Sequence, residues 1–167
     1  DHSAGAKDLT LLGGLKKTMP KTFILMIVAA LSLAGLPPVF GFIAKELLFE
    51  ATLSMYTGLV LVAFTMACLT VAVALVLVVK PFLGSAAKLP QKPHETSLSM
   101  LIGPAILLSL SLLLGVWPAL ADKGLIQAAV GSVSTHNTTF YLSVWHGFNT
   151  ALGLSVLALV IGIVLAK

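Results

Sequence analysis

Charged residues are scarce in this sequence, and arginine is absent altogether. Only 10% of the 167 residues are charged, and all ten basic residues are lysines. A soluble domain has about 25% charged and about 45–50% apolar residues. This sequence is 58% hydrophobic, with a mean hydropathy of +1.06. A soluble core of this length cannot hide so much apolar surface, so the composition predicts a membrane protein.

Cysteine is almost absent, and the lysines do not follow a nucleic-acid-binding pattern. The single cysteine, Cys68, lies in an apolar run, so an internal disulfide is excluded and a packing role is expected. The lysines flank hydrophobic runs instead of forming a stripe beside aromatic residues, which argues against nucleic-acid binding. The sequence has no metal-ligand spacing, nucleophile–base set or phosphate loop. We therefore expect no metal, no other cofactor and no enzyme active site.

Four hydrophobic segments are each long enough for a membrane span of roughly 20 residues. They run from about Thr22 to Leu53, Thr57 to Val79, Leu98 to Trp117 and Tyr141 to Ala166. Segments this apolar must be helical, because lipid offers no partners to backbone groups. The predicted fold is an all-α polytopic membrane protein. We expect a cytoplasmic loop at 1–21, a broken transmembrane helix and the following one at 22–83, a cytoplasmic loop at 84–97, and two further helices with an external linker at 98–167.

The lysines also predict an orientation. With the N-terminal end cytoplasmic, eight lysines fall on the cytoplasmic side and only Lys123 falls outside, which is a clear positive-inside pattern. Both ends of the chain should then face the cytoplasm. The first residues read as an internal loop, so we expect a piece of a longer protein. The cytoplasmic group is Lys7, Lys16, Lys17, Lys21, Lys80, Lys88, Lys92 and Lys167.

Two features concern packing. Residues 53–57 allow only a tight turn, so the first two segments should be antiparallel neighbours. In the fourth segment, small residues four apart would let helix backbones approach closely. They form two expected ridges, Gly147, Ala151 and Ser155 on one and Ala158, Gly162 and Ala166 on the other.

The first segment is too long for one straight span. About 32 helical residues would measure roughly 48 Å, against a hydrocarbon core of about 30 Å. Two consecutive prolines remove two backbone donors, and Pro37 disfavours helical geometry at the residue before it. The sequence therefore predicts two half-helices, Phe23 to Ala34 and about Gly41 to Leu53. The expected break comprises Gly35, Leu36, Pro37, Pro38 and Gly41.

Lys45 lies one turn beyond this break, about eight residues or roughly 12 Å from the external end. A charged lysine at mid-bilayer costs about 2.5–3.5 kcal/mol on insertion scales. Burial disfavours the ammonium form, so proton release and uptake become feasible near neutral pH. Glu46 points about 100° around the helix from Lys45, and Glu50 lies one turn further on. We interpret Lys45 and Glu46 as a proton relay, with Glu50 as a secondary member. The alternative is a lysine that is ion-paired with another helix and only holds the fold together.

The remaining titratable residues carry weaker signals. His146 could relay protons near the external interface, but a packing or interfacial role is the simpler interpretation. Lys80 could join a proton path or extend its ammonium group to the cytoplasmic surface. His94 and Glu95 are expected to be solvated in the cytoplasmic loop.

Several motifs resemble one family of membrane proteins. GGLKKTMP followed by AALSLAGLPPVFGFIAKE is similar to the antiporter-like subunits of respiratory complex I and their relatives. With KPFLG at Lys80–Gly84 and SVWHGFN at Ser143–Asn149, the sequence resembles the MrpA-like subunits of Mrp-type multisubunit Na+/H+ antiporters. The resemblance implies two inverted helix bundles, of which the broken helix belongs to the second. Lys45 matches the family's lysine on that helix, and Glu46 matches its neighbouring acid.

These observations lead to a functional hypothesis. The chain would be part of a proton-translocating subunit of a cation/proton antiporter in a bacterial cytoplasmic membrane. Its partners would be other membrane subunits, the lipid bilayer, protons and Na+. One alternative is the equivalent subunit of a redox-driven pump such as complex I or a membrane-bound hydrogenase. A second alternative is a structural scaffold subunit in which Lys45 is ion-paired.

Overall fold

The computed structural model describes residues 8–9, 12–85, 92–122, 126–133 and 147–167, and every regular element among them is helical. This agrees with the predicted all-α fold. Two of the helices, α5 and α6, are short. The elements are α1 (Pro20–Ala34), α2 (Phe40–Met55), α3 (Thr57–Val78), the π-helix η1 (Val79–Leu83), α4 (Leu98–Val116), α5 (Ala119–Ala121), α6 (Gln127–Val133) and α7 (Thr150–Leu165).

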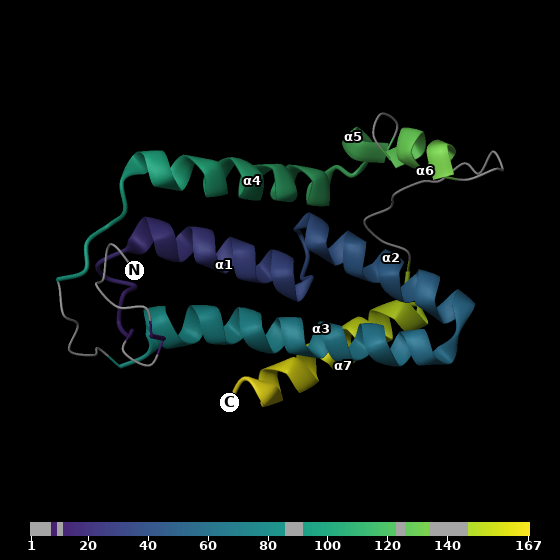
Figure 1. Ribbon diagram of the computed structural model, residues 1–167, viewed down its shortest axis with the longest axis horizontal. Helices are drawn as coiled ribbons and strands as arrows, with labels where there is room; N and C mark the ends of the chain where they lie inside the picture. The colour runs from purple at the N-terminus through teal and green to yellow at the C-terminus, as the bar shows by residue number, and fades with distance from the viewer. Residues whose placement is uncertain (1–7, 10–11, 86–91, 123–125, 134–146) are drawn as a thin grey trace.

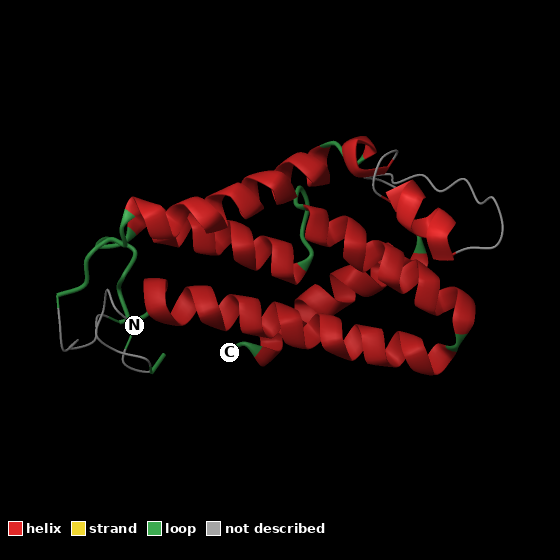
Figure 2. Ribbon diagram, turned by 45° about the horizontal axis from the view of Figure 1, so that its top comes forward, coloured by secondary structure: helices red, strands yellow, loops and turns green. Residues whose placement is uncertain are grey.

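The long helices lie roughly side by side (Figure 1). Helices α1 and α2 follow one another along the same direction, and α3 returns beside both of them. Helix α4 lies against α1 and α2 on the side opposite to α3, while α7 packs against α3 and α2 (Figure 2). Only Tyr56 separates α2 from α3, so the tight turn and the antiparallel pair predicted from residues 53–57 are confirmed.

Two of the apolar elements are long enough to cross a membrane by length and composition. They are Thr57–Leu83, which combines α3 and η1, and Leu98–Val116, which is α4. Helices α1 and α7 are apolar but shorter, with 15 and 16 residues. Helix α1 continues through the break into α2, so the pair forms the predicted long segment in two pieces.

The second segment runs further than predicted, because the helix widens into η1 instead of ending near Val79. Pro81 has no N–H, and the carbonyl oxygens of Pro81 and Phe82 accept hydrogen bonds from the backbone N–H groups of Leu15 and Lys16. Phe82 is buried with Leu15. The N-terminal loop therefore supplies hydrogen-bond donors to the backbone carbonyl groups in the last turn of this segment.

The fourth segment begins later than predicted. Helix α7 starts at Thr150, because the side-chain oxygen of Asn149 accepts a hydrogen bond of 2.8 Å from the backbone N–H of Leu152 and caps the helix. Residues 147–149 are not helical, and the predicted helical residues from Tyr141 to His146 lie outside the described part of the chain.

The small residues of the fourth segment form one buried face, not two ridges. Gly147 precedes the helix and Ala166 follows it. The other four alternate four, three and four residues apart, which keeps them on one side of α7. A Cβ atom on Gly162 would lie 2.5 Å from the Cβ of Val71, so this face packs closely on α3. Its members are Ala151, Ser155, Ala158 and Gly162.

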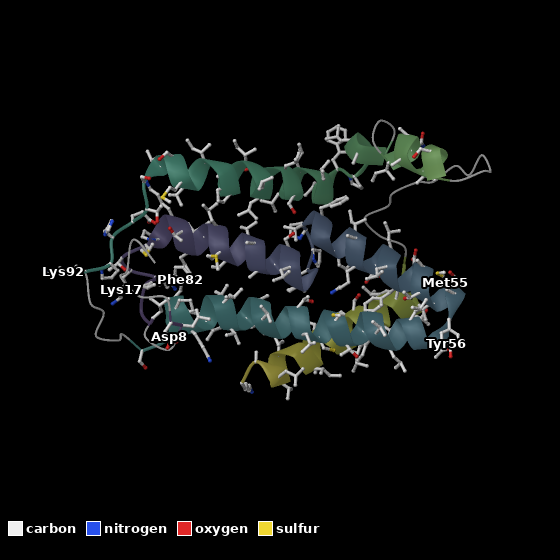
Figure 3. All side chains as sticks on the ribbon, in the orientation of Figure 1. Asp8, Lys17, Met55, Tyr56, Phe82 and Lys92 are labelled. Carbon is white, nitrogen blue, oxygen red and sulfur yellow. The ribbon has the colours of Figure 1, made fainter. Side chains whose placement is uncertain are left out.

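Lysines mark one end of the molecule. Lys17 and Lys92 lie at the end where α1 and α4 begin, while Met55 and Tyr56 lie at the opposite end (Figure 3). Both lysines belong to the group predicted to be cytoplasmic, and the sidedness in the membrane stays a prediction. Hereafter, the Met55 end means the end of the molecule where α2 turns into α3.

Candidate functional site

Glycine ends the first half of the broken helix. Gly35 has φ 65° and ψ 52°, in the left-handed region that favours glycine. Its N–H donates to the carbonyl of Ser32, and the N–H of Leu36 donates to the carbonyl of Leu31. These two bonds close the last turn of α1, which ends at Ala34 as predicted.

The second half begins after the two prolines. The Pro37–Pro38 peptide bond is cis. Val39 is extended and is the N-cap residue of α2. Helix α2 starts at Phe40, one residue before the prediction, and reaches Met55 instead of Leu53. Helix α1 starts at Pro20 instead of Phe23, with proline in its first turn. The break itself lies where Gly35, Leu36, Pro37 and Pro38 predict it.

The ammonium group of Lys45 folds back across the break. Its Nζ donates a hydrogen bond of 3.0 Å to the carbonyl oxygen of Ala34, the last residue of α1. A Cβ atom on Gly35 would lie 2.8 Å from Cε of Lys45, so the lysine chain lies directly over the glycine. The carbonyl groups at a helix C-terminus carry partial negative charge, which stabilises a cation there. Lys45 is half-buried in this position.

Glu46 faces a different element. Its carboxylate is 5% exposed and accepts a hydrogen bond from the hydroxyl of Ser155 on α7. Adjacent residues on one helix point about 100° apart, which agrees with Lys45 reaching α1 while Glu46 reaches α7.

Glu50 is placed in the same way, one turn further along α2. Its Oε1 accepts a hydrogen bond of 2.9 Å from the side-chain amide of Asn149. Neither partner on α7 was predicted from the sequence. Ser155 was identified only as a small packing residue, and no local pattern indicates which carboxylate another helix will bring to it.

The other residues of the predicted site have three different placements. Gly41 is at the break, where a Cβ atom would lie 2.0 Å from the carbonyl oxygen of Ser32, so the start of α2 touches the end of α1. Lys80 is exposed in η1, at the lysine-rich end of the molecule, and the structure does not bring it to Lys45. His146 lies outside the described residues.

Glu95 corrects the expectation of a solvated loop residue. Its carboxylate accepts hydrogen bonds from the backbone N–H groups of Lys21 and Thr22, at 2.9 and 3.3 Å, and from the Thr22 hydroxyl at 2.6 Å. Met19, at the N-cap of α1, offers no side-chain cap, so a residue more than 70 positions away caps this helix. Burial alone would raise the pKa of Glu95. The bonds from Thr22 and Lys21, with the Lys21 charge, outweigh burial and hold that pKa below its usual value.

The space on the other side of the break is apolar. A cavity of about 180 Å³ lies between α1, α3 and α7, and it reaches Ala34 and Leu36 at the break. Its remaining walls are aliphatic, including Val71, Leu75 and Leu159. The described side chains that line the cavity therefore offer Lys45 no polar partner. In the described part of the chain, the hydrogen-bonded carboxylates near Lys45 are Glu46 and Glu50, which lie on α2 between the break and the Met55 end.

The comparisons with known proteins bear on this geometry. Residues 2–70 match the family described as NADH:quinone oxidoreductase/Mrp antiporter, TM, a match that includes α1, the break, α2 and most of α3. Over these residues the chain is similar to this antiporter-like membrane family.

The similarity to single proteins extends beyond the family match. The chain is 35% identical to the Na(+)/H(+) antiporter subunit A1 of Staphylococcus saprophyticus and 32% identical to that of Staphylococcus aureus, in each case over 99% of this chain. Both alignments cover 22% of the relative, so the chain spans about a fifth of the length of these proteins.

A solved structure shows the same arrangement of helices. The chain matches the structure of the Mrp complex from Dietzia sp. DQ12-45-1b with a TM-score of 0.80 and 28% identity, over 99% of this chain and 18% of that one. The predicted resemblance to the antiporter-like family and the predicted polytopic helical fold are therefore confirmed.

Proposed function

We propose that this chain is part of a proton-translocating subunit of a multisubunit Na+/H+ antiporter in a bacterial cytoplasmic membrane, and that Lys45 is its proton relay with Glu46 as the neighbouring acid. The observation that carries the proposal is the hydrogen bond from Lys45 to the carbonyl of Ala34 across the break. A carbonyl oxygen accepts a hydrogen bond from an ammonium group and from a neutral amine alike. Lys45 can therefore keep this partner in both protonation states, as a relay requires.

The same observation bears on the scaffold alternative. A lysine that only holds the fold together would be neutralised by a carboxylate on another helix. Here the hydrogen-bond acceptor of Lys45 is a main-chain carbonyl, and the carboxylate of Glu46 is bonded to α7. This arrangement favours the relay.

The relatives support the antiporter over the redox-driven alternative. The family description names both NADH:quinone oxidoreductase and the Mrp antiporter. The similarity that extends over 99% of the chain is to Na(+)/H(+) antiporter subunits and to a Mrp complex. Because the chain spans about a fifth of those proteins, the exchange of Na+ for protons and the assembly with other subunits are part of the proposal.

The test is a substitution in the full-length subunit within its complex. Purified complex in vesicles is assayed for the Na+-dependent pH change, with Lys45→Ala against the exposed Lys17→Ala as the matched control. We expect Lys45→Ala to lower antiport about a hundredfold or more, as for other positioned proton-transfer groups, while the complex still assembles. Normal antiport in an assembled Lys45→Ala complex would overturn the relay.

A further inference from the structure

Two polar pairs cross the otherwise apolar interface between α2 and α7. They are Glu46 with Ser155 and Glu50 with Asn149, and we name them the α2–α7 pairs. Glu46 and Glu50 are four residues apart and share one face of α2. Ser155 is 4% exposed and Glu46 is 5% exposed.

The surroundings of these pairs are aliphatic and aromatic. Phe49, Ala151 and Ala158 are fully or almost fully buried in one cluster beside them. The small buried residues of α7 already let it pack closely on its neighbours, and a buried carboxyl is costly unless it is hydrogen-bonded. Two carboxyl groups on this face therefore call for a role other than adhesion.

Within the described ranges, few other titratable groups lie on the helices that pack around the α2–α7 pairs. Along α2 itself, Lys45 precedes Glu46 directly. Helices α4 and α7 contain no titratable residue, α3 contributes Cys68, and α1 contributes Lys21 in its first turn at the far end. Among the described residues, Glu46 thus has Lys45 beside it in the chain, Glu50 one turn away and the hydroxyl of Ser155 in hydrogen-bond contact.

We propose that Ser155 and Asn149 are positioning residues that hold Glu46 and Glu50 as successive proton stations between Lys45 and the Met55 end. This inference rests on the proposed function. The proton leaves the Lys45 ammonium, giving the neutral amine, and passes through water to the Glu46 carboxylate, giving the carboxylic acid. The acid passes the proton to the Glu50 carboxylate, also through water, and Glu50 releases it to water at the Met55 end. Each station returns to its starting form when Lys45 takes up a new proton.

The chemistry of the two partners fits these steps. A serine hydroxyl is both a donor and an acceptor, so Ser155 can donate to the Glu46 carboxylate and can accept from the protonated acid. Asn149 donates from its amide to Glu50 while its oxygen caps α7, so the helix cap fixes the amide beside the carboxylate. Both partners lie on α7 or at its N-cap, which makes this helix part of the proton path and not only a packing element.

The closing experiment measures antiport against pH in the assembled full-length complex. Ser155→Ala should lower antiport about fivefold at the wild-type optimum and displace the pH profile by roughly one unit, because hydrogen bonds to a carboxylate favour its charged form. Ser155→Thr retains the hydroxyl and should restore the profile. Ser111→Ala is the matched control, because it removes a hydroxyl contact of 3.2 Å between α4 and Ser32 of α1 that involves no carboxylate. It should leave the profile in place.

A second variant tests the inference if the Ser155→Ala complex does not assemble. Asn149→Asp keeps the oxygen that caps α7 but removes the amide donor to Glu50, so it should also displace the profile. An assembled Ser155→Ala complex with the wild-type profile would overturn the inference. So would an equal displacement in Ser111→Ala, or loss of assembly in both α7 variants while Ser111→Ala assembles.

If Lys45→Ala abolishes antiport while the Ser155 profile is unmoved, only this inference fails. Normal antiport in Lys45→Ala removes the proposed function instead.

Discussion

Lys45 donates its hydrogen bond to Ala34, eleven residues earlier in the chain, so one side chain of α2 caps the end of α1. The two half-helices are therefore joined by more than the backbone of the break. The bond places a cation at the negative end of the α1 dipole, which stabilises the charge, while the adjacent Glu46 carboxylate accepts a hydrogen bond from Ser155. Any movement of α2 relative to α1 alters the environment of this ammonium group.

The contact between Lys45 and Gly35 predicts the effect of a single methyl group. Gly35→Ala would place a Cβ atom 2.8 Å from Cε and 3.1 Å from Nζ of Lys45, in a left-handed conformation that alanine adopts at a cost of about 1–2 kcal/mol. The lysine must leave its position, so we expect antiport to fall about tenfold, a change of about 1.4 kcal/mol in the barrier. Vesicle assays of the assembled complex measure this loss. Wild-type antiport in Gly35→Ala would show that the placement of Lys45 over Gly35 is unimportant.

The packing of α4 on the break predicts an effect on stability. Gly115→Ala would place a Cβ atom 2.2 Å from the carbonyl oxygen of Pro38 and 2.6 Å from the carbonyl carbon of Val39. Both neighbours are backbone atoms, so α4 must move away, and we expect a loss of about 1–3 kcal/mol. The melting temperature of the solubilised complex should fall by several degrees.

Gly103→Ala is the control for that measurement, because it lies in the same helix and its Cβ would meet nothing within 4 Å. Alanine is the better helix former by about 1 kcal/mol. Gly103→Ala should therefore leave the melting temperature unchanged or raise it. An equal fall in both variants would contradict the close approach of α4 to the break.

The cap that Glu95 provides predicts that the stability of the first turn of α1 depends on pH. The folded-state pKa of Glu95 lies below its usual 4.5. Its contribution to stability is therefore complete above pH 4.5 and is lost as the pH falls through the lower folded value. Hydrogen exchange at the Lys21 and Thr22 amides should be slow at neutral pH and should accelerate in that acid range.

Glu95→Gln tests the same cap without a titratable group. Its amide oxygen can still accept a hydrogen bond, but the charge that favours the helix N-terminus is gone. Exchange at these amides should be faster than in the wild type at neutral pH and should lack the additional acceleration in acid. The same acid step in Glu95→Gln would assign it to another group.

The sequence was most informative where structure is decided locally. Gly35, Pro37 and Pro38 fix the break, because a left-handed residue and two missing N–H groups cannot be continued as a helix in any context. The depth of Lys45 in the membrane stays a prediction from residue spacing. Residue spacing also predicted that Glu46 would point away from Lys45, but it did not identify the partner of Glu46.

The features that could not be predicted depend on contacts between distant residues. Ser155 reaches Glu46 across 109 positions and Glu95 reaches Lys21 across 74. No periodicity in one segment shows which face a neighbouring helix will present. The small residues of the fourth segment were placed on two ridges, because spacing alone does not show that α7 begins only at Thr150 and presents a single face to α3.

Because the acceptor at position 34 is a peptide oxygen, no replacement of that side chain removes it. A systematic alanine scan would therefore detect the donor of this hydrogen bond, the Lys45 side chain, and would miss its backbone acceptor. Backbone chemistry would reveal the other half: an ester in place of the peptide bond between Ala34 and Gly35 weakens that oxygen as an acceptor, removes the Gly35 N–H that donates to Ser32, and leaves every side chain in place.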